Sequence, residues 1–313
     1  MTASYFKTIL VASTCTLMST NALTAQAVAS NKEEQIIESH FDFNFSPDGQ
    51  NMIYYAYKGK KLPDIYKKPH HGSEINLTSS SETWDIEPDY SPDGSKILYS
   101  SGDSMAVMNL HIMNADGGDS RLLIDLEDSI VGPTWSPDGK KIAFSTFKMG
   151  SENPEGDVFI ANHDGTHVKN LTDDISGSAV KPTWSKDGTH LYFAHSETKD
   201  GPADIYRMTS EGTDITRLTD LSAIELKVFD VQLTPDSSTL VFAATDSEGW
   251  TDIYAIPANA KKPATKPHQI TKTEEASEYF LSFTPNGHHL TYSVGDWENG
   301  FSFAHIPTPK GHH

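Results

Sequence analysis

The stretch GPTWSPDGKKIAFSTF, residues 132–147, decides the fold of this chain. Its centre, Ser136 to Gly139, has the chemistry of a tight turn. Serine suits the first turn position, proline presets φ at the second, and glycine takes a position where positive φ is often required. Short apolar runs flank the turn on both sides. The phrase therefore predicts a hairpin between two strands and has a structural role.

The turn phrase recurs along the chain. The copies are FSPDG from 45, YSPDG from 90, WSPDG from 135, WSKDG from 184, LTPDS from 233 and FTPNG from 283, spaced 45, 45, 49, 49 and 50 residues apart. A period of this size is typical of repeated units that bury their apolar faces against each other. We therefore expect six structural repeats.

Each repeat contains four short runs with strand chemistry. In the third copy these runs are the segment before the turn, Ile142 to Phe144, Val158 to Ala161, and HVKNLT after the hairpin NHDG. The third run recurs as D-I-Y or a variant that starts at Asp64, Asn109, Asp157, Asp204 and Asp252, with Ser302 in the sixth copy. Four strands in each of six units predict an all-β fold, a six-bladed β-propeller of four-stranded antiparallel blades.

The order W-S-P-D-G, apolar strand, D-I-Y and closing L-T resembles the TolB-like family of propeller repeats. The resemblance covers nearly the whole chain after the first thirty residues and implies the propeller fold. TolB itself also carries an amino-terminal α/β domain, for which we expect no counterpart in this sequence. Related propellers occur in pectin-fragment lyases and accompany serine peptidases, but no G-x-S-x-G is present, so a peptidase is not expected. The family's propellers serve many roles, so the resemblance implies no single function.

Residues 1–29 read as a cleavable signal peptide, with Lys7, an apolar stretch from Thr8 to Met18 and small residues at Ala25 and Ala27. The propeller would then occupy residues 30–313, in the periplasm or outside the cell. The sole cysteine, Cys15, falls in the leader, so no disulfide is expected. The net charge of −19 disfavours nucleic acid and anionic membranes and favours basic partners.

Closure of the ring requires one more strand, because the 26 residues after Gly287 are too few to complete the sixth blade. The apolar candidate is EQIIES, around Ile36 and Ile37. We expect this amino-terminal segment to close the ring, as an unpaired sheet edge is otherwise left open.

The strand before each turn should line a central channel, with alternate residues facing inward. Two residues before the serine or threonine are Asn44, Asp89, Thr134, Thr183, Gln232 and Ser282; four before are Asp42, Glu87, Gly132, Lys181, Asp230 and Phe280; six before, the polar ones are His40, Asp85 and Glu278. We therefore expect a polar channel with an acidic mouth.

Alternation places Asp85, Glu87 and Asp89 on one face of a single strand, beside Asp42 of the preceding blade. Converging carboxylates suit a hard cation such as calcium. The alternative is a hydrated channel whose carboxylates repel each other and bind no metal. We favour this alternative, because strand-borne carboxylates lack the loop that usually completes calcium coordination.

Histidine and tryptophan supply further candidates. His195 and His40 are the histidines expected to reach the channel, where either could act as a base. The histidine pairs at 70–71, 288–289 and 312–313 lack metal-ligand spacing and are expected at the surface. Trp84, Trp250 and Trp297 either anchor a partner or pack over their own blades. The acidic loop KMGSENPEG from Lys148 is a candidate recognition loop.

These observations favour a monomeric, non-catalytic binding or scaffold propeller that recognises a protein or envelope partner through an acidic channel face. The expected contact residues are Trp84, Asp85, Glu87, Lys181, Asp230, Trp250, Glu278 and Trp297. No cofactor is expected beyond calcium at Asp42, Asp85, Glu87 and Asp89 in the metal alternative. The second functional hypothesis is a carbohydrate-active enzyme, similar to the lyase propellers, that uses His195 or His40 with a channel-bound cation.

Overall fold

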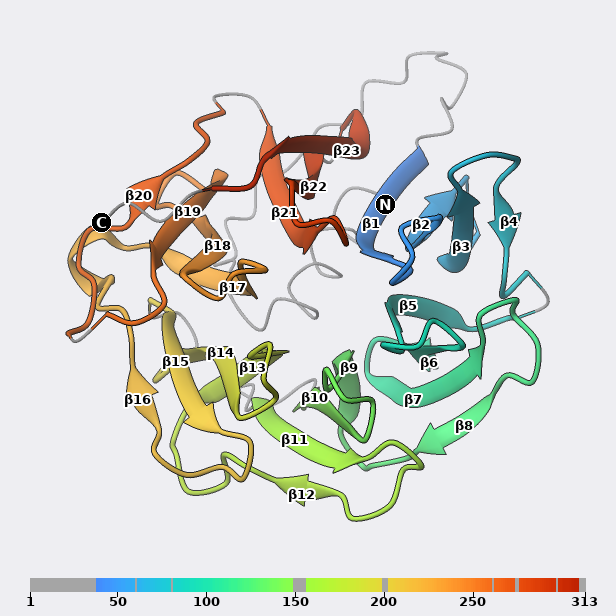
Figure 1. Ribbon diagram of the computed structural model, residues 1–313, viewed down its shortest axis with the longest axis horizontal. Coiled ribbons are helices and arrows are strands. Elements are labelled where there is room, and N and C mark those ends of the chain that lie inside the picture. Colours follow the sequence, from blue (N-terminus) through green and yellow to red (C-terminus); the bar gives the residue numbers. More distant parts are fainter. Residues whose placement is uncertain are drawn as a thin grey trace, which may run out of the picture.

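The structure, a computed structural model, describes residues 38–59, 61–79, 81–148, 156–198, 202–260, 262–273, 276–296 and 298–309. Six antiparallel sheets stand like blades around a central opening (Figure 1). The six-bladed all-β propeller predicted from the turn phrase is thus confirmed.

The first three blades each have four strands. They are β1 (Glu38–Phe45), β2 (Asn51–Lys58), β3 (Asp64–Pro69) and β4 (Ile75–Asn76); β5 (Trp84–Tyr90), β6 (Lys96–Ser104), β7 (Val107–Asn114) and β8 (Arg121–Ile124); and β9 (Ser129–Trp135), β10 (Lys141–Phe147), β11 (Gly156–Asn162) and β12 (Lys169–Asn170).

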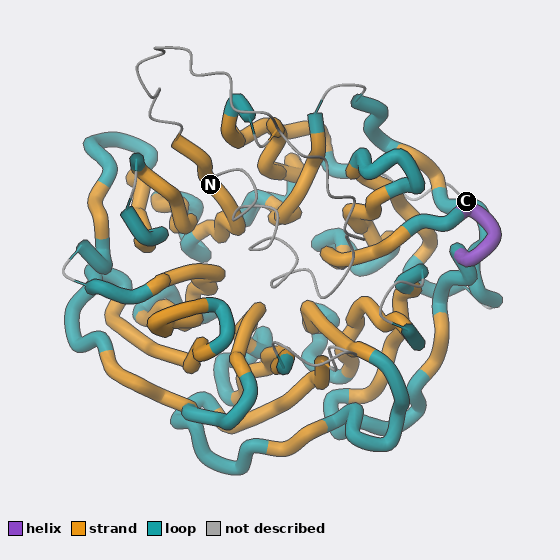
Figure 2. Tube along the Cα trace, turned by 180° about the vertical axis from the view of Figure 1, so that it is seen from behind, coloured by secondary structure: helices purple, strands orange, loops and turns teal. Residues whose placement is uncertain are grey.

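The next two blades repeat this order and the last has three described strands. They are β13 (Ser178–Trp184), β14 (His190–Ser196), β15 (Asp204–Thr209) and β16 (Thr216–Arg217); β17 (Lys227–Leu233), β18 (Thr239–Thr245), β19 (Thr251–Pro257) and β20 (His268–Gln269); and β21 (Ser277–Phe283), β22 (His289–Asp296) and β23 (Gly300–Pro307). A three-residue 3₁₀ turn, η1 (Ser222–Ile224), is the only helix in the described part of the chain (Figure 2). No helix in that part is long and apolar enough to span a bilayer.

The first strand of every blade lies at the centre, and in the five blades with a described fourth strand this strand lies at the rim (Figure 1). Apolar side chains fill the spaces between neighbouring blades, as where Ile142 and Phe144 of the third blade pack with Leu98 and Leu110 of the second. Burial of such faces is the main stabilising contribution of a repeat architecture.

The first and last blades meet through aromatic side chains of β1, β21 and β23. The Phe41 ring lies 5.1 Å from Phe301 and 5.8 Å from Phe280, and the Phe43 ring lies 5.1 Å from Phe303. The expected closing strand around Ile36 and Ile37 lies outside the described residues, so its pairing with the sixth blade stays a prediction.

The repeated turns have one hydrogen-bond pattern. In the first copy the Ser46 hydroxyl donates to the Asp48 carboxylate (2.6 Å) and accepts from the Asn51 backbone N–H (2.9 Å). The Gln50 N–H donates to the same carboxylate (2.9 Å). Glycine follows the turn with φ near 70°, and Ser237 of the fifth copy has φ 59°. The left-handed conformation expected at this position is therefore present even where the glycine is missing.

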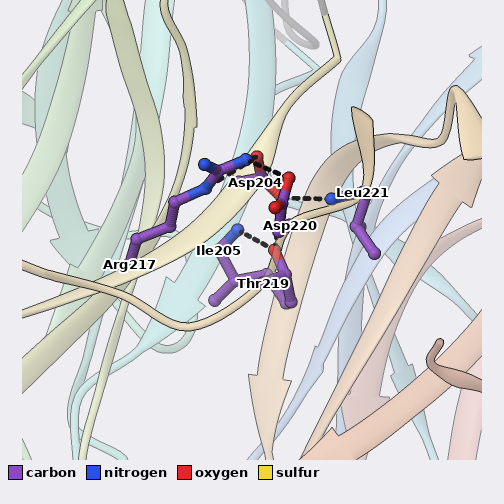
Figure 3. Close-up of polar contacts among 6 residues, drawn as sticks. All are labelled: Asp204, Ile205, Arg217, Thr219, Asp220 and Leu221. Carbon is purple, nitrogen blue, oxygen red and sulfur yellow. Dashed lines mark hydrogen bonds and ion pairs between the residues drawn. The ribbon is translucent and has the colours of Figure 1, made fainter. Parts of the chain in front are cut away.

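The recurring D-I-Y and L-T motifs are bonded to one another (Figure 3). Thr219 donates its hydroxyl proton to Asp204 (2.7 Å) and accepts from the Ile205 N–H (2.9 Å), while the Leu221 N–H also donates to Asp204 (3.0 Å). Arg217 donates to Asp204 (2.5 Å) and to Asp220 (2.8 Å). The same threonine-to-N–H bond occurs at Thr78, Thr172 and Thr271, so these motifs fix the third strand to the end of the fourth.

The propeller has two distinct ends. One, here called the turn face, carries the S-P-D-G turns and the hairpins between the third and fourth strands. The other, the loop face, carries the hairpins between the second and third strands and the connections from each fourth strand to the next blade.

Candidate functional site: the central cavity and the loop face

The inner strands carry a β-bulge near their midpoints. In β5 the pairing with β6 passes from Ile86 opposite Ser100 to Asp89 opposite Leu98, so two residues face one. The same irregularity occurs in all six inner strands, one residue earlier in β17. Left-handed φ marks the bulge at Asp42, Glu87, Gly132, Lys181 and Phe280. A bulge inserts one residue into a strand and reverses the facing of every residue beyond it.

The bulge corrects the expected inward-facing set. Asp85 lies opposite Ser101 and Asp89 opposite Leu98, and these partners are three residues apart on β6, so they face opposite sides of the blade. The expectation that Asp85, Glu87 and Asp89 share one face was therefore wrong. Of the residues two and four positions before the turns, all except Phe280 line the channel, whereas those six positions before do not.

A polar cavity of about 110 Å³ occupies the centre of the ring at the level of the bulges. Its charged lining residues are Asp42, Glu87, Asp89, Lys181 and Asp230. Lys181 reaches across the channel from the fourth blade: its Nζ lies 3.1 Å from Asp42 Oδ2 in the first blade and 2.7 Å from Glu87 Oε1 in the second. One ammonium thus bridges three blades.

The carboxylates in the cavity also bond to the inner strand of the neighbouring blade. Glu87 accepts from the Gly132 N–H (2.6 Å), Asp89 from the Trp135 N–H (2.8 Å), and Asp230 from the Leu281 N–H (2.6 Å). Asp89 accepts a further bond from the Asn44 side chain (2.7 Å). These acids therefore hold adjacent blades together, a role that the repulsive channel expected from the sequence did not include.

Burial perturbs the acids of the cavity. It raises the pKa of Asp89 to about 7, although the Trp135 N–H and the Thr134 hydroxyl offset part of the rise. It raises the pKa of Asp230 to about 6 against the attraction of Lys181, and it also raises the pKa of Glu87. For Lys181, burial lowers the pKa, but the charges of Asp42, Glu87 and Asp230 together outweigh burial and raise it above its ordinary value. The lysine therefore stays charged at neutral pH.

The four carboxylates proposed as calcium ligands do not converge. Within the described ranges no three His, Cys, Asp or Glu side chains are gathered as a metal site would require. Asp85 instead accepts from the hydroxyls of Ser101 (2.6 Å) and Thr83 (3.1 Å), away from the cavity. Calcium binding by the remaining acids stays a prediction, which the effect of calcium on the melting temperature tests.

The two candidate catalytic histidines do not line the cavity. His195 is buried, its Nε2 donates to the Ser176 carbonyl (3.0 Å), and its ring packs on Tyr206. His40 packs between the first and last blades, against Tyr54 and Phe303. The bulge explains both positions. His40 lies six residues before its turn, and His195 pairs with Ala179, which lies six residues before the turn of the fourth blade.

The remaining candidate contact residues differ in exposure. Trp84 of the second blade is buried against Tyr57 of the first, so it packs between these two blades. Glu278 is also buried and accepts from the Thr271 hydroxyl. Trp250 is half-buried in the hairpin after β18, whereas Trp297 and most of the loop KMGSENPEG lie outside the described residues.

The loop face carries a group of exposed acids that the sequence reasoning missed. They are Glu82, Asp103, Asp125, Glu127, Asp173, Asp174, Glu197, Glu225, Glu248 and Glu298, against three exposed lysines, Lys61, Lys148 and Lys272, in the described part of this face. None of these ten carboxylates has a hydrogen bond or ion pair to another described residue. Their positions between strands were visible in the sequence, but only the strand directions place them at one end.

The acids of the S-P-D-G turns, on the opposite face, are bonded locally. Asp187 accepts from the Ser185 hydroxyl (2.6 Å) and from the Thr189 N–H (3.0 Å) and hydroxyl (2.7 Å). The Ser185 bond is the main reason that the pKa of Asp187 falls to about 2. Asp48, Asp93, Asp138 and Asp236 have lowered pKa values for the same reason. These carboxylates serve the turns.

Comparison with known proteins agrees with this architecture. A family model described as the TolB beta propeller domain matches residues 100–307. The chain belongs to the TolB β-propeller family. A search among curated proteins found no match.

Solved structures show the same fold at low sequence identity. TolB from Acinetobacter baumannii is 18% identical with a TM-score of 0.58; the match covers 88% of this chain and 64% of that one. This member of the TolB family thus spans less than two thirds of that TolB chain. An oligogalacturonate lyase in complex with manganese is 16% identical with a TM-score of 0.62, and the match covers 87% of this chain and 78% of the lyase.

Proposed function

We propose that this TolB-family propeller is a non-catalytic binding module of the periplasm or the cell exterior that recognises a basic polypeptide through its loop face. The observation that carries the proposal is the set of ten exposed, unbonded carboxylates on that face. Complementary charge speeds association and selects partners, and it does so most where charges are not already paired.

The proposal relocates the recognition surface expected from the sequence. Each acid of the channel is bonded to a group inside the ring, so breaking that bond to bind a partner would cost free energy. The loop-face acids have none, and loops held by a rigid scaffold commonly carry binding residues. Trp250, half-buried among them in the hairpin after β18, supplies an aromatic contact at the same end.

The test is affinity capture from an envelope extract with two matched baits. In the loop-face variant, Glu82→Gln, Glu127→Gln, Asp173→Asn and Asp174→Asn are combined. In the turn-face variant, Asp116→Asn, Asp164→Asn, Glu211→Gln and Asp214→Asn remove the same charge. We expect a basic protein that the wild type and the turn-face variant retain and the loop-face variant loses. Equal retention by all three proteins would refute the loop face as the binding surface.

A lyase-like activity on an oligosaccharide is the second hypothesis, and it rests on the fold shared with oligogalacturonate lyase. Fold analogy alone is a weak argument for activity. His195 and His40 are its candidate bases, although each has a packing role between strands or blades. Incubation with oligogalacturonates should release unsaturated products that absorb in the ultraviolet if this hypothesis holds; no absorbance change with wild-type protein would end it.

A further inference from the structure

A cavity of about 320 Å³ lies on the turn face between the third and fourth blades, away from the central channel. These are the neighbouring blades of β9–β12 and β13–β16 in Figure 1. The turns that follow β9 and β13 form part of the lining, and so does Trp184 at the end of β13. Pockets for small organic ligands begin at about 300 Å³, so this cavity has room for one small ring.

Trp184 contributes an unsatisfied polar group to the lining. Its side chain is 8% exposed, and its indole N–H has no hydrogen-bond partner in the part of the chain that the structure describes. A buried tryptophan N–H ordinarily finds an acceptor, and leaving it unbonded costs free energy. An oxygen atom of a ligand would supply that acceptor.

Lys141 is a second unbonded donor of the cavity. In the second blade, the equivalent Lys96 lies opposite Asn114 and donates to its side-chain oxygen (2.6 Å). Lys141 lies opposite Asn162 in the same register, yet its half-buried ammonium has no hydrogen bond or ion pair to another described residue. The Asn162 amide instead bonds within its own hairpin, to Thr166 (2.8 Å). The third blade therefore leaves free the ammonium that the second blade binds.

Acceptors and apolar groups complete the cavity. The Glu211 carboxylate is exposed and has no bond to a described residue, and Asp187 uses only its Oδ1 within the turn. The rings of Trp184 and Pro137 and the Ile160 side chain supply apolar contact area. A sugar ring needs this combination, because its hydroxyls donate and accept while its C–H groups pack on apolar surface.

The charges of the lining favour a neutral ligand. Lys141 and Lys186 are positive, whereas Asp138, Asp187 and Glu211 are negative. The acids would repel an anion, and the lysines would repel a cation. A hydroxyl can donate to a carboxylate and accept from an ammonium, so a neutral polyol suits both kinds of group.

We infer that this cavity binds one pyranose ring of a neutral sugar, with the Trp184 N–H and the Lys141 ammonium donating to its oxygens. The inference does not rest on the proposed function, because the loop face lies at the other end of the propeller. The protein would then bind a polypeptide at one end and a glycan at the other.

The test is NMR titration of the ¹⁵N-labelled protein with methyl glycosides of glucose, galactose, mannose and N-acetylglucosamine. The variants Trp184→Phe and Trp135→Phe assign the two indole N–H signals. Trp135 is the internal control: it precedes the third turn, its buried N–H likewise has no described partner, and it does not line this cavity. We expect at least one glycoside to shift the Trp184 signal and to leave the Trp135 signal unchanged. No shift with any of the glycosides would overturn the inference.

A matched pair of lysine variants tests the second donor. Lys141→Met should weaken binding of the responding glycoside about tenfold, as loss of a charged hydrogen bond does. Lys96→Met removes the bonded lysine of the second blade and should leave the affinity unchanged. Equal affinities of the two variants would refute the site. Tighter binding of glucuronate or glucosamine than of the responding glycoside would refute the neutral class of ligand.

Discussion

The two ends of this propeller carry acids in different states. On the turn face, aspartates of the repeated turns are bonded to nearby hydroxyls and N–H groups, and their pKa values are lowered. On the loop face, ten exposed carboxylates have no bonded partner among the described residues. Acidic residues in this chain therefore have one of two roles: they stabilise the fold, or they stay available at the surface. Whether the carboxylate is hydrogen-bonded, more than net charge, distinguishes the two roles.

The acids of the central cavity test this distinction most strongly, because they are buried and bonded within the fold. Lys181→Met would leave the carboxylates of Asp42 and Glu87 without their ammonium partner. We expect the free energy of unfolding to fall by about 3 kcal/mol, as for other buried charges that lose their partner. Urea denaturation measures the change.

The matched control is Lys186→Met on the turn face, where the exposed lysine donates only to the Pro235 carbonyl. This change should cost less than about 0.5 kcal/mol. Similar losses for the two variants would show that the bridge across the channel adds nothing to stability.

The buried acids also predict a pH dependence. The pKa of Asp89 is raised by burial to about 7, so the folded protein binds a proton that the unfolded chain has lost above pH 4. The contribution of Asp89 is fully present below pH 4 and is lost as pH rises through about 7. Stability should fall from pH 5 to pH 8, and Asp89→Asn should flatten that slope. A slope unchanged by the substitution would mean that Asp89 ionises normally in the fold.

The turn acids should respond differently from the loop-face acids. Asp187→Ala removes the acceptor of three hydrogen bonds and should cost about 1 kcal/mol. Asp173→Ala on the loop face removes an unbonded exposed charge and should change stability by a few tenths of a kcal/mol at most. Thermal unfolding of the two variants measures these changes in stability, and equal losses of stability would contradict the distinction between the two faces.

Substitution of Ser237 by glycine is a small covalent change that should increase stability. Ser237 holds φ 59° where the other turns have glycine, so Ser237→Gly should relieve backbone strain and stabilise by about 0.5 to 1 kcal/mol. A lower melting temperature would mean that the serine side chain makes a compensating contact.

Calcium should have the least effect of all. The Lys181 ammonium already lies between Asp42 and Glu87 and pairs with both, and Asp85 lies outside the cavity. We expect no rise in melting temperature on addition of calcium. A rise that Glu87→Gln removes would restore the metal site as a working hypothesis.

The sequence predicted the architecture because its evidence is local and repeated. The turn phrase, the D-I-Y strand and the closing L-T each act within one blade, and Figure 3 shows Asp204 and Thr219 joined as those motifs require. The left-handed conformation at Ser237 followed from its position in the repeat.

The channel could not be predicted in the same way. Asp42, Glu87 and Lys181 occupy the bulge without being glycine, so only Gly132 marked it in the sequence. Simple alternation then placed Asp85 and His40 on the wrong side. The bond between Lys181 and Asp42 joins residues 139 positions apart, and no local pattern encodes such a contact.

The central claim is that the loop face, and not the turn face, attracts a basic polypeptide. Its most direct test is the dissociation constant of decalysine for the wild type and the two four-substitution variants, measured by fluorescence anisotropy at fixed salt. The account predicts a loss of about tenfold or more for the loop-face variant and a change below about twofold for the turn-face variant. Equal weakening in both would contradict it, because net charge alone would then explain the binding.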